Sequence, residues 1–168
     1  MNAQNRLTIN AVALISPSNS PIIVHTYRSH PSSLKYHFVA HTALDIIEER
    51  LATGTDCYLG LLHTLEDQAV YGYVTPTRIR IVISLALTDT LVRDADVITT
   101  FKSLHTAYAR ALANPFLPAR GTLLSPAAEQ QNGTGPNPLD SSSLLVGSKA
   151  LQRRLVEIGD ALGVDEHS

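Results

Sequence analysis

The residues best suited to chemistry in this chain are two histidines and an aspartate. His37, His41 and Asp45 follow one another at intervals of four residues. On a helix this interval places side chains on one face. Two imidazoles and a carboxylate on one face can bind a metal ion such as zinc. A metal-dependent enzyme that uses these three residues is therefore one hypothesis for this chain.

Other catalytic patterns are missing from the sequence. It has no glycine-rich phosphate loop after a predicted strand and no Gly-x-Ser-x-Gly elbow. The adjacent carboxylates Glu66 and Asp67 fall in a predicted tight turn, where acidic side chains are favoured for backbone reasons. No glutamate follows His37 as it would in a zinc protease helix. We therefore favour a solvated polar face for the two histidines, and expect no catalytic residue, no metal site and no cofactor.

Composition sets the broad class. The chain has 168 residues, 44% of them hydrophobic, and a formal net charge of -2. This is enough for one globular domain over residues 1–168, without the basic excess of a nucleic-acid binder. A polar start, no apolar run that could span a bilayer and a single cysteine, Cys57, predict a cytoplasmic protein without internal disulfides. We expect the thiol of Cys57 to be a small buried hydrophobe at the start of a strand.

Apolar patterns predict the order strand, strand, helix, three strands, helix, loop, helix. Short breaks at 65–67 and 75–77 are too small to hold a helix, so the three central strands should pair antiparallel. Apolar residues on both faces of the first strand require helices on both faces of the sheet. The predicted elements are strands 7–15 and 22–26, a helix 34–51, strands within 57–85, a helix 94–113 and a helix starting after Ser148.

Two strands carry specific expectations. In the first strand, alternation places Ile9 on the face of Ala13 and Ile15, with Leu14 on the opposite face. In the last strand, an Arg pair, residues 78 and 80, opens the strand on the face opposite its isoleucines and is expected to approach solvent. Residues 118–147 are rich in Gly, Pro, Ser, Asn and Gln, and predict a mobile insertion.

The polar side of the first predicted helix carries two apolar side chains that do not suit a solvated face. Leu34 and Phe38 join His41 and Asp45 in a ridge at helical spacing. An aromatic anchor among charged residues is typical of a protein contact. The four residues therefore predict a partner-binding surface. The alternative is that Phe38 packs beneath a neighbouring loop.

The sequence resembles the sedlin family of trafficking protein particle (TRAPP) complex subunits over residues 9–116. The segments that carry the resemblance are LKYHFVAHTALD at 34–45, YLGLL at 58–62, EDQAVYGYVT at 66–75, FKSLHTAY at 101–108 and NPF at 114–116. The YGYVT strand is most similar to the subunit 2-like branch of the family.

The resemblance implies an α+β, longin-like (SNARE-like) fold with one helix on one sheet face and two on the other. It further implies a non-catalytic adaptor subunit of TRAPP, a tethering complex that exchanges nucleotide on Rab GTPases at Golgi and ER–Golgi membranes. Partners would be the core small subunits and the large subunits, and Asp45 matches a family aspartate associated with docking. A stand-alone regulatory longin domain is a further alternative, although no coiled-coil heptads follow the domain.

Overall fold

The computed structural model describes residues 7–27, 33–54, 56–65, 68–87, 92–114 and 148–162, and the side chains of residues 33, 34 and 162 are not among the described groups. The element order agrees with the sequence pattern, and the predicted insertion 118–147 lies outside the described residues. The elements are β1 (Ile9–Ile15), β2 (Pro21–Thr26), α1 (Ser33–Thr53), β3 (Tyr58–Leu65), β4 (Gln68–Val74), β5 (Arg80–Ala86), α2 (Asp94–Leu112) and α4 (Lys149–Leu162).

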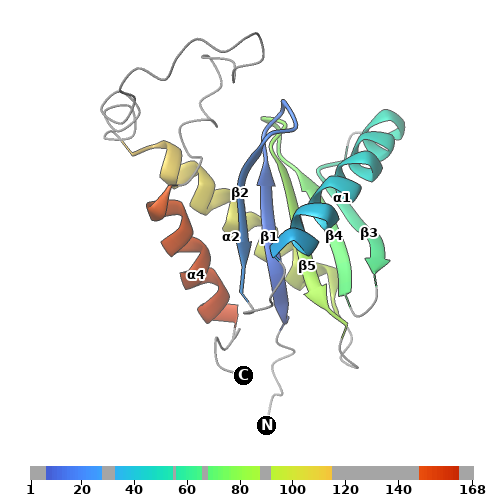
Figure 1. Ribbon diagram of the computed structural model, residues 1–168. Coiled ribbons are helices and arrows are strands. Elements are labelled where there is room, and N and C mark those ends of the chain that lie inside the picture. The colour runs from blue at the N-terminus through green and yellow to red at the C-terminus, as the bar shows by residue number, and fades with distance from the viewer. Residues whose placement is uncertain are drawn as a thin grey trace.

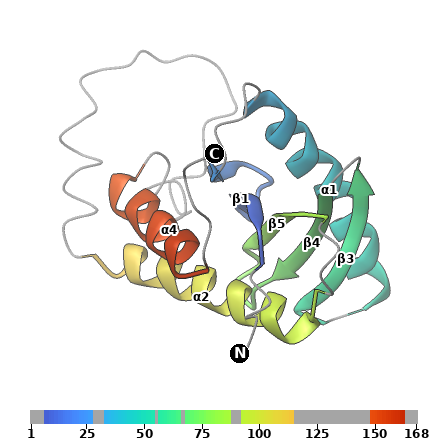
Figure 2. The same ribbon diagram turned by 90° about the horizontal axis from the view of Figure 1, so that it is seen from below.

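The strands form one five-stranded sheet in the order β2-β1-β5-β4-β3. Every neighbouring pair is antiparallel, as the short turns predicted. Helix α1 covers one face of the sheet, and α2 and α4 lie on the opposite face (Figures 1 and 2). The predicted α+β, longin-like arrangement of helices is therefore confirmed.

Each sheet face has its own apolar core. Beneath α1, the side chains of Val39, Ala43 and Ile47 pack on Ala13 and Val82. The larger core lies beneath α2 and α4, where the aromatic ring of one α2 residue and two leucines of α4 are fully buried. Its largest fully buried side chains are those of Ile9, Leu14, Ile81, Ile83, Leu85, Phe101, Leu104, Leu151 and Leu155.

The side chain of Ile9 faces the opposite way from the sequence prediction. It lies in the core beneath α2 and α4, whereas Ala13 and Ile15 lie beneath α1. The cause is a register shift: Ile9 pairs with Leu85 and Ala11 pairs with Ser84, so the residue between them has no counterpart in β5. One extra residue reverses the alternation of side chains from that point, and periodicity alone cannot reveal such a bulge.

The predicted approach to solvent holds for Arg78, which is exposed, but is wrong for Arg80, and only Arg80 lies within the strand. Arg78 lies in the turn before β5 with a φ of 62°, because the N–H of Ile79 bonds to Thr75 Oγ1 (2.9 Å) and closes the turn. Arg80 starts β5 but is buried, and its guanidinium donates to the carbonyl oxygens of Ser16 (3.1 Å) and Pro17 (3.3 Å). It thus connects β5 to the β1–β2 turn.

Cys57 was also expected to be buried, and it is exposed. It precedes β3, and its carbonyl oxygen accepts a hydrogen bond from the N–H of Val74 (2.7 Å). The backbone of Cys57, and not its thiol, is used by the fold.

Helix α4 is held to the sheet by a tyrosine that follows β2. The hydroxyl of Tyr27 donates to the carbonyl oxygen of Leu155 at 2.7 Å. The helix starts after Ser148, as the sequence predicted, and the N–H of Leu151 donates to Ser148 Oγ (3.4 Å), which caps the helix. Burial, and to a lesser extent the carboxylate of Asp160, raises the pKa of Tyr27 above its ordinary value.

This raised pKa makes the attachment of α4 sensitive to alkali. The neutral phenol is favoured in the folded chain, so its contribution is complete below about pH 10 and is lost as pH rises above that value. We expect Tyr27→Phe to be about 1 kcal/mol less stable at pH 7, because it lacks the bond to Leu155. Urea unfolding at pH 7 and at alkaline pH should show this gap narrowing, and a gap that stays constant would contradict the prediction.

Candidate docking surface on the first helix

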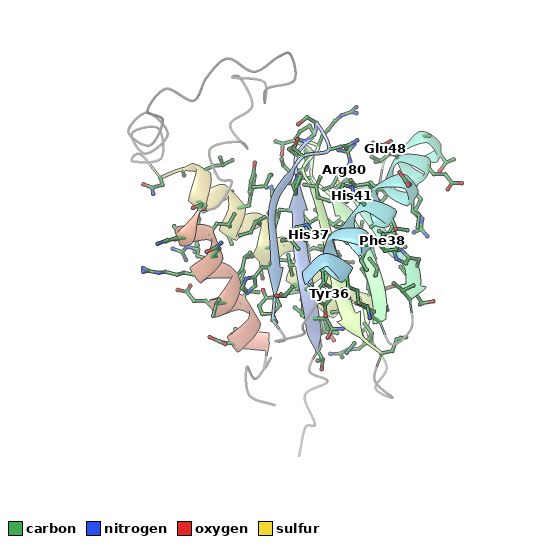
Figure 3. The ribbon with its side chains drawn as sticks, in the orientation of Figure 1. Tyr36, His37, Phe38, His41, Glu48 and Arg80 are labelled. Atoms are coloured by element: carbon green, nitrogen blue, oxygen red, sulfur yellow. The ribbon has the colours of Figure 1, made fainter. Side chains whose placement is uncertain are left out.

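Helix α1 exposes one side along its length. Its inner side is anchored to the sheet by buried residues such as Tyr36 and Val39. The outer side presents Phe38, His41 and Asp45, all exposed and spaced three and four residues apart. Figure 3 shows the first two of them on α1. The sequence predicted these three residues as one ridge, and the helix does bring them to one surface. The side chain of Leu34, the fourth predicted member, is outside the described part of the structure.

The ring of Phe38 is the most unusual feature of this surface. It is 63% exposed, so it does not pack beneath a neighbouring loop. A large apolar side chain on a charged helix face loses about 1.5–3 kcal/mol of burial free energy relative to a covered position. Exposed aromatic rings of this kind are typical anchors of protein contacts.

The two histidines border a shallow hollow between α1 and the β1–β2 turn. Its volume is about 10 Å³, and its lining includes His37, His41 and Leu44. A hollow of this size holds about one water molecule. Among the residues that the structure describes, no three His, Cys, Asp or Glu side chains form a group that could hold a metal ion. The metal-enzyme hypothesis therefore lacks a site among the described residues.

One acidic residue of α1 has a structural use that the sequence did not reveal. The Oε1 atom of Glu48 accepts a hydrogen bond from Asn19 Nδ2 (2.9 Å) and lies 3.5 Å from the guanidinium of Arg80. Asn19 has a φ of 63°, a conformation that asparagine tolerates better than most residues. These contacts join α1 to the β1–β2 turn and fix the orientation of the exposed surface.

The sheet edge beside α1 is partly occupied by the chain itself. Strand β3 is an outer strand, and edge strands can recruit a partner strand. The guanidinium of Arg50 donates to the carbonyl oxygens of Leu59 and Leu61, the latter at 2.7 Å. These carbonyls are therefore already bonded. The side chain of Leu61 remains 43% exposed and is an apolar residue that the sequence analysis did not single out.

Tyrosines on the opposite face serve to position α2. The hydroxyl of Tyr58 donates to Asp94 Oδ1 at 2.8 Å, at the first residue of the helix. Burial, followed by this bond to Asp94, raises the pKa of Tyr58, and burial also raises the pKa of Tyr71. Both phenols therefore stay protonated at neutral pH, and the hydroxyl of Tyr58 acts as a hydrogen-bond donor, which suits a structural role.

Within the part of the chain that the structure describes, none of the helices has the length and apolar character needed to span a bilayer.

Together, the antiparallel sheet, the helices on both faces and the exposed α1 define a longin-like domain whose candidate site is a surface and not a cleft. The Sedlin family model matches residues 14–133. The chain belongs to the sedlin family.

Several relatives carry names from one complex. The trafficking protein particle complex subunit 2-like protein of Mus musculus is 35% identical over 114 residues, which is 62% of this chain and 80% of the relative. The protein of the same name from Dictyostelium discoideum is 36% identical, over 64% of this chain and 81% of the relative. A probable trafficking protein particle complex subunit 2 of Caenorhabditis elegans is 30% identical, over 56% and 64% of the two chains.

Proposed function

We propose that this protein is a non-catalytic adaptor subunit of a TRAPP complex and that it acts in vesicle transport. Membership of the sedlin family and the names of the relatives support the assignment to the complex. The observation that carries the adaptor role is the exposed aromatic ring of Phe38, in line with His41 and Asp45 on a helix that is firmly attached to the sheet.

The proposed docking surface is the ridge formed by Leu34, Phe38, His41 and Asp45. A partner that covers the ring of Phe38 gains apolar burial, and a cationic side chain opposite Asp45 gives that contact direction and specificity. The hydrogen bonds of Glu48 hold the helix in place before binding, so little ordering is needed when a partner docks.

The proposed partners and location of the protein follow from its proposed membership of a TRAPP complex. The partners are other TRAPP subunits, both the small core subunits and the large ones. Nucleotide exchange on Rab GTPases is the work of the assembly, so contact with a Rab is indirect. We place the protein in the cytoplasm, at Golgi and ER–Golgi membranes, which it reaches through the complex. Residues 1–168 act as one domain in this proposal.

Substitutions on the ridge should weaken assembly without unfolding the domain. Phe38→Ala removes the anchor, and Asp45→Tyr replaces the carboxylate by a bulky ring. We expect each variant to reduce co-purification of co-expressed TRAPP subunits at least about tenfold, which corresponds to one lost hot-spot contact. Because both side chains are exposed, the midpoint of thermal unfolding should stay within a few degrees of the wild type.

Two matched variants control for the chemistry of these changes. Leu87→Ala removes another exposed apolar side chain, at a residue that is 52% exposed beyond β5. Asp56→Tyr makes the same aspartate-to-tyrosine change at an exposed position before β3. Both should assemble like the wild type. Full assembly by the ridge variants, or equal losses in the controls, would count against α1 as the docking surface.

A further inference from the structure

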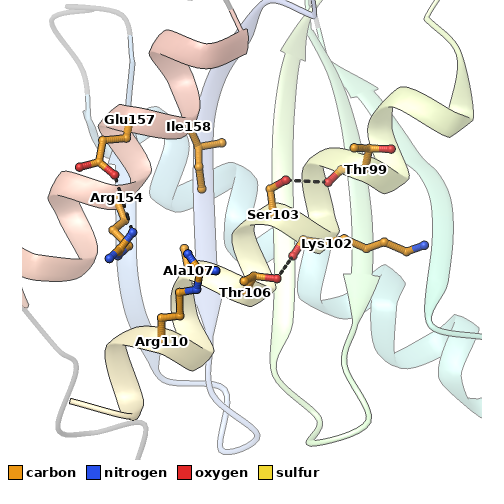
Figure 4. A pocket seen from close by; sticks show the side chains of 9 residues that line it. All are labelled: Thr99, Lys102, Ser103, Thr106, Ala107, Arg110, Arg154, Glu157 and Ile158. Carbon is orange, nitrogen blue, oxygen red and sulfur yellow. Dashed lines mark hydrogen bonds and ion pairs between the residues drawn. The ribbon is translucent and has the colours of Figure 1, made fainter. Parts of the chain in front are cut away.

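A second surface lies on the opposite side of the molecule, where α2 and α4 run side by side. Between them is a groove of about 370 Å³, away from the sheet (Figure 4). This volume is in the range of sites that hold a small ligand or a few residues of a peptide. None of the ridge residues lies on α2 or α4, so the groove is a separate feature.

The groove is built from side chains that repeat at helical spacing. Lys102, Thr106 and Arg110 follow one another at intervals of four along α2 and line one wall. Arg154 stands on α4, so the two walls together contribute three cationic side chains. The floor is apolar and consists of Ala107, which is buried, and Ile158, which packs against the larger core.

The side chains that line the groove carry more positive than negative charge. Among the described residues that line it, the one acidic side chain is that of Glu157, which lies 3.9 Å from the guanidinium of Arg154. Both of these side chains are exposed, at 47% for Arg154 and 70% for Glu157, so the pair contributes little to stability and can rearrange. Three cations and one carboxylate leave an excess of positive charge in a chain whose formal net charge is -2.

The hydroxyl groups of the groove are neutral, so they do not offset this positive charge. Ser103 Oγ donates to the carbonyl oxygen of Thr99 (3.0 Å), and Thr106 Oγ1 donates to that of Lys102 (2.8 Å). Their protons are thus directed into the helix. An anionic occupant would be held by the ammonium and guanidinium groups at the rim.

We propose that this groove binds an acidic segment of a partner protein, in which carboxylates flank one aliphatic side chain. The aliphatic group would lie on Ala107 and Ile158, and the carboxylates would pair with Lys102, Arg110 and Arg154. Charge complementarity selects this occupant, because an apolar floor below a cationic rim matches both parts of such a segment. The site goes beyond the α1 ridge and does not depend on it.

A membrane surface fits the groove less well than a peptide. Binding to a bilayer combines basic side chains with exposed apolar groups that enter the headgroup region. The large apolar residues exposed on the described part of the chain are Phe38, Leu61 and Leu87, and none of them lines the groove. The cations here surround a hollow and not a protruding apolar surface.

The experiment uses the full chain and a fluorescein-labelled peptide of sequence Gly-Glu-Asp-Leu-Asp-Glu-Gly, monitored by fluorescence anisotropy. We expect it to bind at least about tenfold more tightly than the matched peptide with Gln and Asn in place of Glu and Asp. The double variant Lys102→Glu, Arg110→Glu should weaken binding of the acidic peptide at least about tenfold. Raising the salt concentration to about 0.5 M should weaken it as well.

The control for charge reversal is Arg153→Glu, an exposed arginine of α4 that is not in the groove lining. It should change binding less than about twofold, within the effect of a distant surface charge. All variants are first shown to unfold at the wild-type temperature. Equal binding of the neutral peptide, or equal losses in the Arg153 variant, would overturn the proposal.

Three further arms test other occupants. Inorganic phosphate that binds as tightly as the peptide would reduce the groove to a general anion site and overturn the proposal. Phosphatidylserine vesicles that bind the wild type but not the double variant, while the peptide binds neither, would overturn it in favour of a membrane contact. A chain ending at Leu162 lacks residues 163–168, which include Asp165 and Glu166. If the peptide binds only after this truncation, the groove of the full chain is occupied by the chain's own residues 163–168. That result would overturn the assignment of the groove to a partner protein.

Discussion

Replacing Phe101 by alanine is expected to destabilise the domain by about 3–5 kcal/mol, the largest effect of any single change proposed for this protein. The ring has no exposed surface and lies at the centre of the larger core. It stacks on Tyr73, with ring centroids 5.3 Å apart, and lies 6.2 Å from the ring of Tyr58. Alanine would remove all of these contacts and leave a cavity between α2 and the sheet.

The measurement is equilibrium unfolding in urea, followed by tyrosine fluorescence and by far-UV circular dichroism. Phe101→Leu keeps most of the volume and should cost less, about 1.5 kcal/mol, because only the aromatic contacts are lost. Ser103→Ala, at an exposed position two residues further along α2, should be close to neutral. A Phe101→Ala variant as stable as the leucine variant would show that α2 does not pack on the sheet as described.

Phe101 was predictable because the pattern that identifies it is local. The 3.6-residue period of α2 places Phe101 with Val97, Leu104 and Tyr108 on one side, and all four are buried. The same argument placed Phe38 on the outside of α1, and there the ring is exposed. Periodicity assigns a side chain to a face of its own helix, so it succeeds wherever that face alone decides burial, as for Phe101 and Phe38.

The sequence predictions failed at residues whose burial or orientation depends on a distant part of the chain. Arg80 was predicted to reach solvent at the start of its strand, but its guanidinium donates to the carbonyl oxygens of Ser16 and Pro17, more than sixty residues earlier. The face of Ile9 depends on a one-residue bulge against β5, which leaves no mark in the apolar pattern of β1. Neither pairing can be obtained from spacing within one element.

The groove between α2 and α4 could not be predicted from the sequence for the same reason. Its cations come from α2 and α4, and residues 113–148 separate these helices in the sequence. Within α2 alone, Lys102 and Arg110 look like ordinary solvated charges. Only the packing of α4 beside α2 places Arg154 opposite them and forms the groove. The placement of Phe38, His41 and Asp45 on one exposed side of α1 could be predicted because all three belong to one helix.

Gly159 decides how closely α4 can approach the sheet, and Gly159→Ala is expected to be destabilising although alanine favours helix. On propensity alone, the change should stabilise α4 by about 1 kcal/mol. A Cβ at this position, however, would lie 2.2 Å from Cε1 and 2.5 Å from Cδ1 of the Tyr27 ring. This ring is buried, its hydroxyl is bonded to Leu155, and its edge contact with His25 has a centroid distance of 4.7 Å. It therefore has little freedom to move away.

We expect a net loss of about 1–3 kcal/mol for Gly159→Ala, because overpacking of a buried contact outweighs the gain in helix propensity. The loss should be concentrated in α4, so amide hydrogen exchange of residues 151–162 should accelerate more than that of β1 or β5. Gly54→Ala is the matched control: the nearest atom to its Cβ would be the carbonyl oxygen of Arg50, at an ordinary 3.8 Å.

The same variant links stability to the proposed groove. Helix α4 supplies Arg154 and Ile158, so a shift of this helix away from Tyr27 should also weaken binding of the acidic peptide, while the ridge on α1 should assemble normally. A Gly159→Ala protein that is more stable than the wild type would mean that α4 does not rest on Tyr27, and the groove would then lose one of its walls.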